Sequence, residues 1–174
     1  MTPHFGTVTI VGAGLLGASL GLALKTRGLA SEVRGVGRRQ APLDCALERG
    51  AIDSAHLDLA EAVSGADLIV VCTGAAAVCD QLDRILPPLS PAAVVTDVAS
   101  TKAAICRHAR ATWPAPLRFV GSHPMARSEK SGPEPAVAGL YAGAHVIVCP
   151  EGADGEAVGV VRSLWESVGA VVTE

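Results

Sequence analysis

The sequence lacks a basic N-terminal segment: Lys25 follows the first apolar stretch instead of preceding it. This argues against a secretory signal peptide, which begins with a basic region. The apolar stretch at residues 68–79, between Asp67 and Asp80, is too short to cross a bilayer. We therefore expect a cytoplasmic protein that has no contact with a membrane.

The cysteine and charge patterns that mark metal sites and nucleic-acid surfaces are also missing. The five cysteines include no C-x-x-C pair, and no two cysteines or two histidines lie two to four residues apart. A metal site therefore has no support, and reduced thiols are expected. The 14 basic residues form no run of like charge, and the formal net charge is −3. We predict no nucleic-acid partner.

Aromatic residues are scarce, at 3%, whereas 49% of the chain is hydrophobic. Small and aliphatic side chains suit helices that pack closely on a buried parallel sheet. Short apolar runs alternate with helical patterns along the whole chain. The predicted strands are 7–11, 33–36, 68–72, 93–96, 117–120, 145–149 and 170–173. The predicted helices are 15–27, 41–49, 75–86, 101–112 and 153–168, and residues 121–135 are predicted to be a loop.

This alternation predicts an α/β fold of the Rossmann type, with a doubly wound and mostly parallel sheet. Residues 1–174 are expected to form one domain of this type, because the pattern leaves no segment for a second one.

The segment Gly12-Ala13-Gly14-Leu15-Leu16-Gly17 has the form G-x-G-x-x-G, between a predicted strand and a predicted helix. In this context Gly12 permits a tight turn, Gly14 lets a pyrophosphate approach the backbone, and Gly17 lets helix and strand pack closely. The alternative is that the glycines serve packing alone. The residues assigned to cofactor binding here are Gly12, Gly14, Leu15, Leu16 and Gly17, together with Thr73 after the strand at 68–72.

The end of the second strand indicates which dinucleotide binds. An NAD site usually has an acidic residue there, but this sequence has Gly37, followed by Arg38 and Arg39. Two guanidinium groups can bind a 2′-phosphate through charge-assisted hydrogen bonds. We predict that NADP is preferred over NAD. The alternative is that both arginines are solvated and NAD binds through backbone groups.

Two polar segments follow later strands, at residues 96–102 and 121–132. Both are expected at the carboxyl ends of strands, where ligands bind in a doubly wound sheet. His123, fixed by the following proline, is a candidate general base. The alternative is an ordinary solvated or structural imidazole.

The sequences of these two segments resemble motifs of the prephenate/arogenate dehydrogenase family. Residues 97–102 read D-V-A-S-T-K and residues 121–132 read G-S-H-P-M-A-R-S-E-K-S-G, similar to the family's D-V-G-S-x-K and G-G-H-P-M-A-G-x-E-x-S-G. The G-x-G-L-x-G-x-S-L opening at 12–20 and L-W-E-S-V-G-A at 164–170 extend the resemblance over nearly the whole chain. Ala99, Ser122 and Arg127 each replace a family glycine.

The resemblance implies an oxidative decarboxylation of prephenate or arogenate in tyrosine biosynthesis, with hydride transfer to NAD(P). His123 would accept the hydrogen bond or proton of the substrate hydroxyl, and Ser100 would orient that hydroxyl or the nicotinamide. Lys102, Glu129 and Ser131 would position the substrate. No metal is implied.

The resemblance also implies a C-terminal helical dimerisation domain, which is absent from this sequence. We therefore expect a missing helical domain or partner subunit, a homodimer in the complete protein, and weak or no activity of this domain alone. The high hydrophobic content predicts an exposed apolar face on the helix at 153–168, near Trp165, which the missing helical domain would cover. Two alternatives stay open: a non-catalytic NADP-binding or regulatory module, and a related 3-hydroxyacid dehydrogenase or pyrroline-carboxylate reductase.

Overall fold

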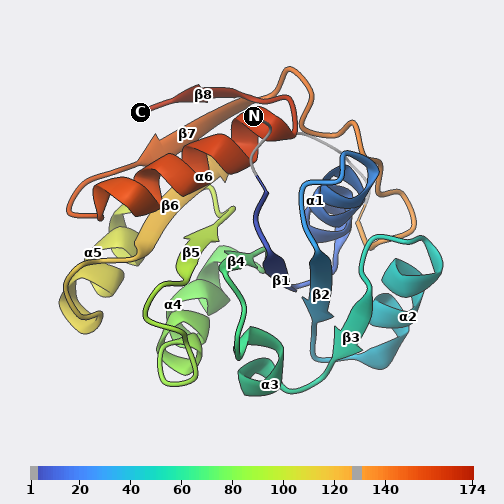
Figure 1. The fold of residues 1–174 in the computed structure, drawn as a ribbon, viewed down its shortest axis with the longest axis horizontal. Helices are drawn as coiled ribbons and strands as arrows, with labels where there is room; N and C mark the ends of the chain where they lie inside the picture. The colour runs from blue at the N-terminus through green and yellow to red at the C-terminus, as the bar shows by residue number, and fades with distance from the viewer. Residues whose placement is uncertain (1–3, 127–130) are drawn as a thin grey trace.

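A computed structural model describes residues 4–126 and 131–174, whose strands form one eight-stranded sheet in the order β3-β2-β1-β4-β5-β6-β7-β8 (Figure 1). All neighbouring strands are parallel except β6 and β7. The strands are β1 (Thr7–Val11), β2 (Glu32–Val36), β3 (Ser54–His56), β4 (Leu68–Val71), β5 (Val94–Asp97), β6 (Phe119–Pro124), β7 (His145–Cys149) and β8 (Val171–Thr173). The predicted doubly wound, mostly parallel sheet is confirmed.

Helices cover both faces of this sheet. They are α1 (Leu15–Thr26), α2 (Gln40–Glu48), α3 (Leu59–Val63), α4 (Ala75–Ile85), α5 (Ala103–Thr112) and α6 (Gly155–Ser167). Side chains of α1, α2 and α6 share one apolar cluster, and those of α3, α4 and α5 share another. The central strand β4 is buried along its whole length, as expected for a strand with helices on both faces.

Glycines end α1 and α2 where the sequence predicts, and an acidic residue caps the start of α6. Gly28 and Gly50 follow α1 and α2 with φ of +63° and +70°, a conformation that stops a helix. Asp154 caps α6 by accepting hydrogen bonds from the amides of Glu156 and Ala157.

The predicted loop at residues 121–135 is wrong at its beginning. Gly121–Pro124 continue β6, because β7 pairs antiparallel with them in the register Gly121↔Cys149 to Pro124↔Val146. The apolar run ends at Val120, but the tertiary pairing extends the strand by four residues. His123 therefore lies on a strand.

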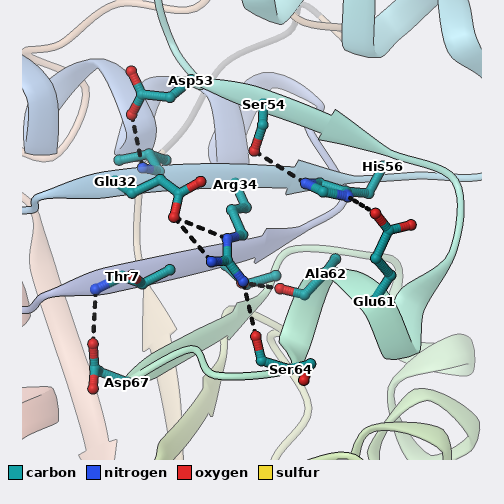
Figure 2. A network of polar contacts seen from close by, with 12 residues as sticks. Thr7, Glu32, Arg34, Asp53, Ser54, His56, Glu61, Ala62, Ser64 and Asp67 are labelled. Atoms are coloured by element: carbon teal, nitrogen blue, oxygen red, sulfur yellow. Dashed lines mark hydrogen bonds and ion pairs between the residues drawn. The ribbon is translucent and has the colours of Figure 1, made fainter.

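The sequence analysis missed β3 and α3, which are short and carry polar residues. Side-chain contacts hold this region to the sheet (Figure 2). Arg34 on β2 binds the Glu32 carboxylate and donates to the Ser64 carbonyl at 2.9 Å, just after α3. His56 on β3 contacts Ser54 and, at 3.5 Å, the Glu61 carboxylate. The Arg34–Ser64 contact spans 30 residues of chain and stabilises a region that has little periodicity of its own.

The predicted apolar face around Trp165 is also wrong. The Trp165 side chain is fully buried, where it packs against Tyr141 with ring centroids 5.2 Å apart. The segment between β6 and β7 covers this side of the core: the Tyr141 hydroxyl donates to the Leu16 carbonyl on α1 at 2.8 Å. Within the described residues, no helix is long and apolar enough to cross a membrane.

Candidate functional site

The three glycines of the loop between β1 and α1 have different surroundings. Gly12 has φ of +99°, and a Cβ there would lie 2.9 Å from the Thr73 side chain. A Cβ on Gly17 would lie 2.2 Å from the Gly12 carbonyl oxygen, so that helix and loop are in contact. A Cβ on Gly14 would meet no atom within 4 Å. Gly14 thus leaves an open space in front of the helix.

The amino end of α1 faces this space without a side-chain cap. Gly14 is the N-cap, and the first turn contains no acidic residue. The amide of Ala18 makes the first helical hydrogen bond, to the Gly14 carbonyl at 2.8 Å. The amides of Leu15, Leu16 and Gly17 precede it, so the helix presents N–H donors and positive potential to an anion.

A cavity of about 380 Å³ lies at the carboxyl ends of β1, β2 and β4. Six of the residues that the sequence assigns to the cofactor line it: Gly12, Gly14, Gly37, Arg38, Arg39 and Thr73. Leu15, Leu16 and Gly17, in the first turn of α1, are not among its described lining residues. A volume of this size is typical of small-molecule and cofactor sites.

Sequence reasoning missed the rest of the lining. It includes Pro42, Leu43, Leu57, Leu59, Gln81, Arg84, Gly132 and Pro133. Leu57 and Leu59 belong to the region of β3 and α3 that the sequence pattern does not reveal. Gln81 and Arg84, one turn apart on α4, could have been found from the helical spacing and the position of α4 after a central strand. Gln81 accepts a hydrogen bond from the Thr73 hydroxyl at 2.6 Å, which fixes Thr73 at the rim.

The second pair of predicted residues follows β5 and β6. These strands are parallel neighbours with Thr96 opposite Val120, so Ser100 and His123 both come beyond the paired positions at the same edge of the sheet. Ser100 is exposed and His123 is half-buried. Neither is part of the described lining of the 380 Å³ cavity. The strand register and the hydrogen bonds of Asp97 and Ser122 place the Ser100 and His123 segments near each other.

Asp97 joins the two segments from within the core. Its carboxylate is fully buried and accepts hydrogen bonds from the amides of Ala99 at 3.1 Å and Ser122 at 3.3 Å. Lys102 forms an ion pair with it and also donates to the Ser122 carbonyl at 3.0 Å. Burial raises the pKa of Asp97, and the Lys102 ammonium opposes this rise. Lys102, predicted to position the substrate, thus contacts the protein's own scaffold.

Ser122 is the second link, with its hydroxyl in three hydrogen bonds. It donates to the Asp97 carbonyl at 2.6 Å, contacts the Thr96 hydroxyl at 3.0 Å and accepts from Trp165 Nε1 at 3.0 Å. One hydroxyl can donate once and accept twice, so its capacity is filled. These bonds fix the backbone on which His123 is the next residue.

The remaining predicted residues lie beside this network or outside it. The buried Nδ1 of His123 has no hydrogen-bond partner in the described part of the chain. Ser131 is exposed, and the following Gly132 and Pro133 line the cofactor-side cavity. Glu129 and Arg127 lie outside the described residues. No group of three or more His, Cys, Asp or Glu side chains in residues 4–126 and 131–174 is arranged to hold a metal ion.

Comparisons with known proteins identify relatives of this chain. The family described as "Prephenate dehydrogenase, nucleotide-binding domain" matches residues 20–174. The prephenate dehydrogenase of Bacillus subtilis is 29% identical over 170 residues, which are 97% of this chain and 46% of that protein.

Two solved structures share the fold closely. One is Aquifex aeolicus prephenate dehydrogenase in complex with hydroxyphenyl propionate and NAD+: TM-score 0.91, 28% identity, coverage 99% of this chain and 60% of that one. The other is Synechocystis arogenate dehydrogenase: TM-score 0.87, 35% identity, coverage 96% and 58%. The chain spans about half the length of the curated relatives that it matches.

Proposed function

The chain belongs to the family of prephenate dehydrogenase nucleotide-binding domains, and we propose that it is the cofactor-binding half of an enzyme that oxidises prephenate or arogenate. The observation that carries this proposal is the arrangement of two sites along one edge of the sheet. The glycine loop and its cavity lie at β1, β2 and β4, and the segments of Ser100 and His123 follow the adjacent β5 and β6. A dinucleotide on the first site can extend its nicotinamide toward the second.

The residues at the first site fit a dinucleotide. The open space at Gly14 admits a pyrophosphate close to the backbone, where the amides of Leu15, Leu16 and Gly17 can donate to it. Leu57, Leu59 and Leu43 supply apolar surface for a base. When bound, NAD(P) supplies the hydride acceptor. The protein supplies binding and orientation.

We propose that NADP is the preferred cofactor. Gly37 places no carboxylate at the end of β2, and Arg38 and Arg39 are exposed at the cavity wall. Neither arginine forms an ion pair with a carboxylate of the described residues. Both guanidinium groups are thus available to a 2′-phosphate.

At the second site His123 acts as the acceptor. A neutral imidazole there takes the proton of the substrate hydroxyl while the hydride leaves the same carbon and carbon dioxide leaves the ring. Ser100, exposed before α5, orients the hydroxyl or the nicotinamide amide. Asp97, Lys102 and Ser122 hold both segments in place, since their hydrogen bonds join β5 to β6.

The proposal extends to the complete protein. It would act in the cytoplasm as a homodimer, with a helical region that corresponds to the unmatched part of the relatives completing the substrate site. Glu129 and Ser131 are proposed to position the substrate there.

The test is a turnover assay with prephenate and with arogenate. It uses a polypeptide that contains this chain together with the region that corresponds to the rest of its relatives. Reduction of NADP+ with release of carbon dioxide is the expected result. Cofactor binding without turnover of either substrate would instead favour a non-catalytic NADP-binding module. Turnover of a 3-hydroxyacid only would favour a related dehydrogenase.

A further inference from the structure

Two cysteines far apart in the sequence meet beside Gly121. Cys106 lies in the second turn of α5, and Cys149 ends β7 in register with Gly121 on β6. A Cβ on Gly121 would lie 2.8 Å from Cys106 Sγ and 3.7 Å from Cys149 Cβ. Both side chains thus reach the small volume that the glycine leaves open. Both are free thiols.

The pair is accessible to small reagents. A surface cavity of about 400 Å³ is lined by Cys106 and Cys149, with Lys102 and Arg110 beside them. Both cysteines are half-buried, so neither residue is sealed in the core or fully exposed. This combination permits entry of a small oxidant and limits contact with a second protein molecule.

We propose that Cys106 and Cys149 form a reversible intramolecular disulfide when a hydroperoxide enters this cavity. The thiolate of one cysteine attacks a peroxide oxygen, the O–O bond breaks, and a sulfenic acid and hydroxide result. The second thiol then attacks the sulfenic sulfur; the S–S bond forms, and water leaves. Overall, two thiols and one hydrogen peroxide give one disulfide and two waters.

The surrounding charges determine how readily the first step occurs. Burial, with smaller contributions from Cys149 and Asp97, raises the pKa of Cys106 to about 11, and the nearby Arg110 guanidinium opposes this rise. Burial also raises the pKa of Cys149, and Glu151 adds to the rise, whereas Lys102 opposes it for both thiols. Because the thiolate is the reactive form, oxidation accelerates as the pH increases.

The disulfide would lie next to the residues that hold the Ser100 and His123 segments in place. Cys106 is one helical turn after Lys102, and its amide donates to the Lys102 carbonyl at 2.8 Å. Lys102 in turn binds Asp97 and the Ser122 carbonyl. A disulfide would therefore join α5 to β7 directly, next to the hydrogen-bonded residues that support Ser100 and His123.

The experiment exposes the purified chain to hydrogen peroxide at pH 7 and pH 9, then blocks free thiols and digests the protein with trypsin. The expected product is peptide 103–107 joined to peptide 131–162, with the loss of two hydrogen atoms. The five free thiols should fall to three and return to five on reduction. The reaction should be faster at pH 9.

Matched variants identify the pair. Cys106→Ser and Cys149→Ser should each abolish the linked peptide, because a single cysteine of the pair cannot complete the disulfide. Cys45→Ser, on α2 at the opposite end of the sheet (Figure 1), should still form the link. Five free thiols after treatment, a disulfide between other cysteines, or a link only between two protein molecules would overturn the proposal.

Discussion

Trp165 Nε1 on α6 donates a hydrogen bond to Ser122 Oγ on β6 at 3.0 Å, and both side chains are fully buried. The bond joins the last helix to the strand that carries His123. Ser122 replaces a glycine of the family motif, and its hydroxyl also contacts Thr96 and Asp97. The departure from the motif thus adds a tertiary contact that a glycine could not make.

Ser122→Ala should destabilise the protein, because it leaves the buried indole N–H without its acceptor. We expect the free energy of unfolding to fall by about 1–3 kcal/mol. In a double-mutant cycle with Trp165→Phe, urea unfolding should give a combined loss smaller than the sum of the two single losses. Additive losses would show that the two side chains do not interact.

Lys102→Met should destabilise the protein strongly, because it leaves the Asp97 carboxylate buried without a counter-charge. The expected loss at pH 7 is about 3–5 kcal/mol. Lys25→Met is the control, since the Lys25–Asp53 pair is partly exposed and should be worth less than about 1 kcal/mol. Equal losses in the two variants would contradict the importance of the buried pair.

The Lys102→Met loss should depend on pH in a defined direction. Burial already raises the Asp97 pKa above its ordinary value of 3.8, and removing Lys102 raises it further. A raised carboxyl pKa gives stability that is present at low pH and is lost as the pH rises through the folded-state value. The variant should therefore be closest to wild type in acid. A loss that grows as the pH falls would contradict this assignment.

Gly14→Ala should weaken cofactor binding without reducing stability, whereas Gly17→Ala should reduce stability. A Cβ on Gly14 enters open space, so the variant should keep its melting temperature but lose cofactor affinity. A Cβ on Gly17 would lie 2.2 Å from the Gly12 carbonyl, so we expect a stability loss of about 1–3 kcal/mol. Thermal unfolding and calorimetric titration separate the two effects. Unchanged affinity of Gly14→Ala would place the pyrophosphate elsewhere.

Arg38→Ala combined with Arg39→Ala should remove the preference for NADP over NAD. A charge-assisted hydrogen bond to a phosphate contributes about 1.5–3 kcal/mol, which is about ten- to a hundredfold in affinity. NAD affinity should change little. Arg107→Ala, an exposed arginine on α5, is the matched control. Equal or tighter binding of NAD by the wild-type chain in calorimetry would refute the preference.

His123→Asn should lower kcat in the complete enzyme by about 10²–10⁴-fold, because asparagine cannot accept the substrate proton. Ser100→Ala should cost less, since it removes one orienting hydrogen bond. Cofactor affinity should stay unchanged, and His108→Asn on α5 is the control. Near-normal kcat in His123→Asn would refute the role of His123 and show that the chain shares the family's fold but not this catalytic residue.

Local patterns in the sequence are sufficient to predict the doubly wound α/β fold, the glycine loop and the family. These depend on local information: apolar runs of strand length, helical periodicity, and glycines at positions where a side chain would collide. Gly12 and Gly17 have such surroundings, and β1 and β7 have the predicted bounds. The Arg38-Arg39 pair can also be found from the sequence, because it follows the glycine motif at the distance where the second strand ends.

Which side chains are buried, and what they contact, depends on how distant segments pack together. Lys102 contacts Asp97 and Ser122, and Trp165 is in the core, because strands and helices distant in the sequence pack around them. His123 lies on a strand because β7 pairs with residues that have no strand pattern of their own. The meeting of Cys106 and Cys149 beside Gly121 has the same origin, since a contact across 43 residues of chain depends on the register of β6 with β7 and has no local signature.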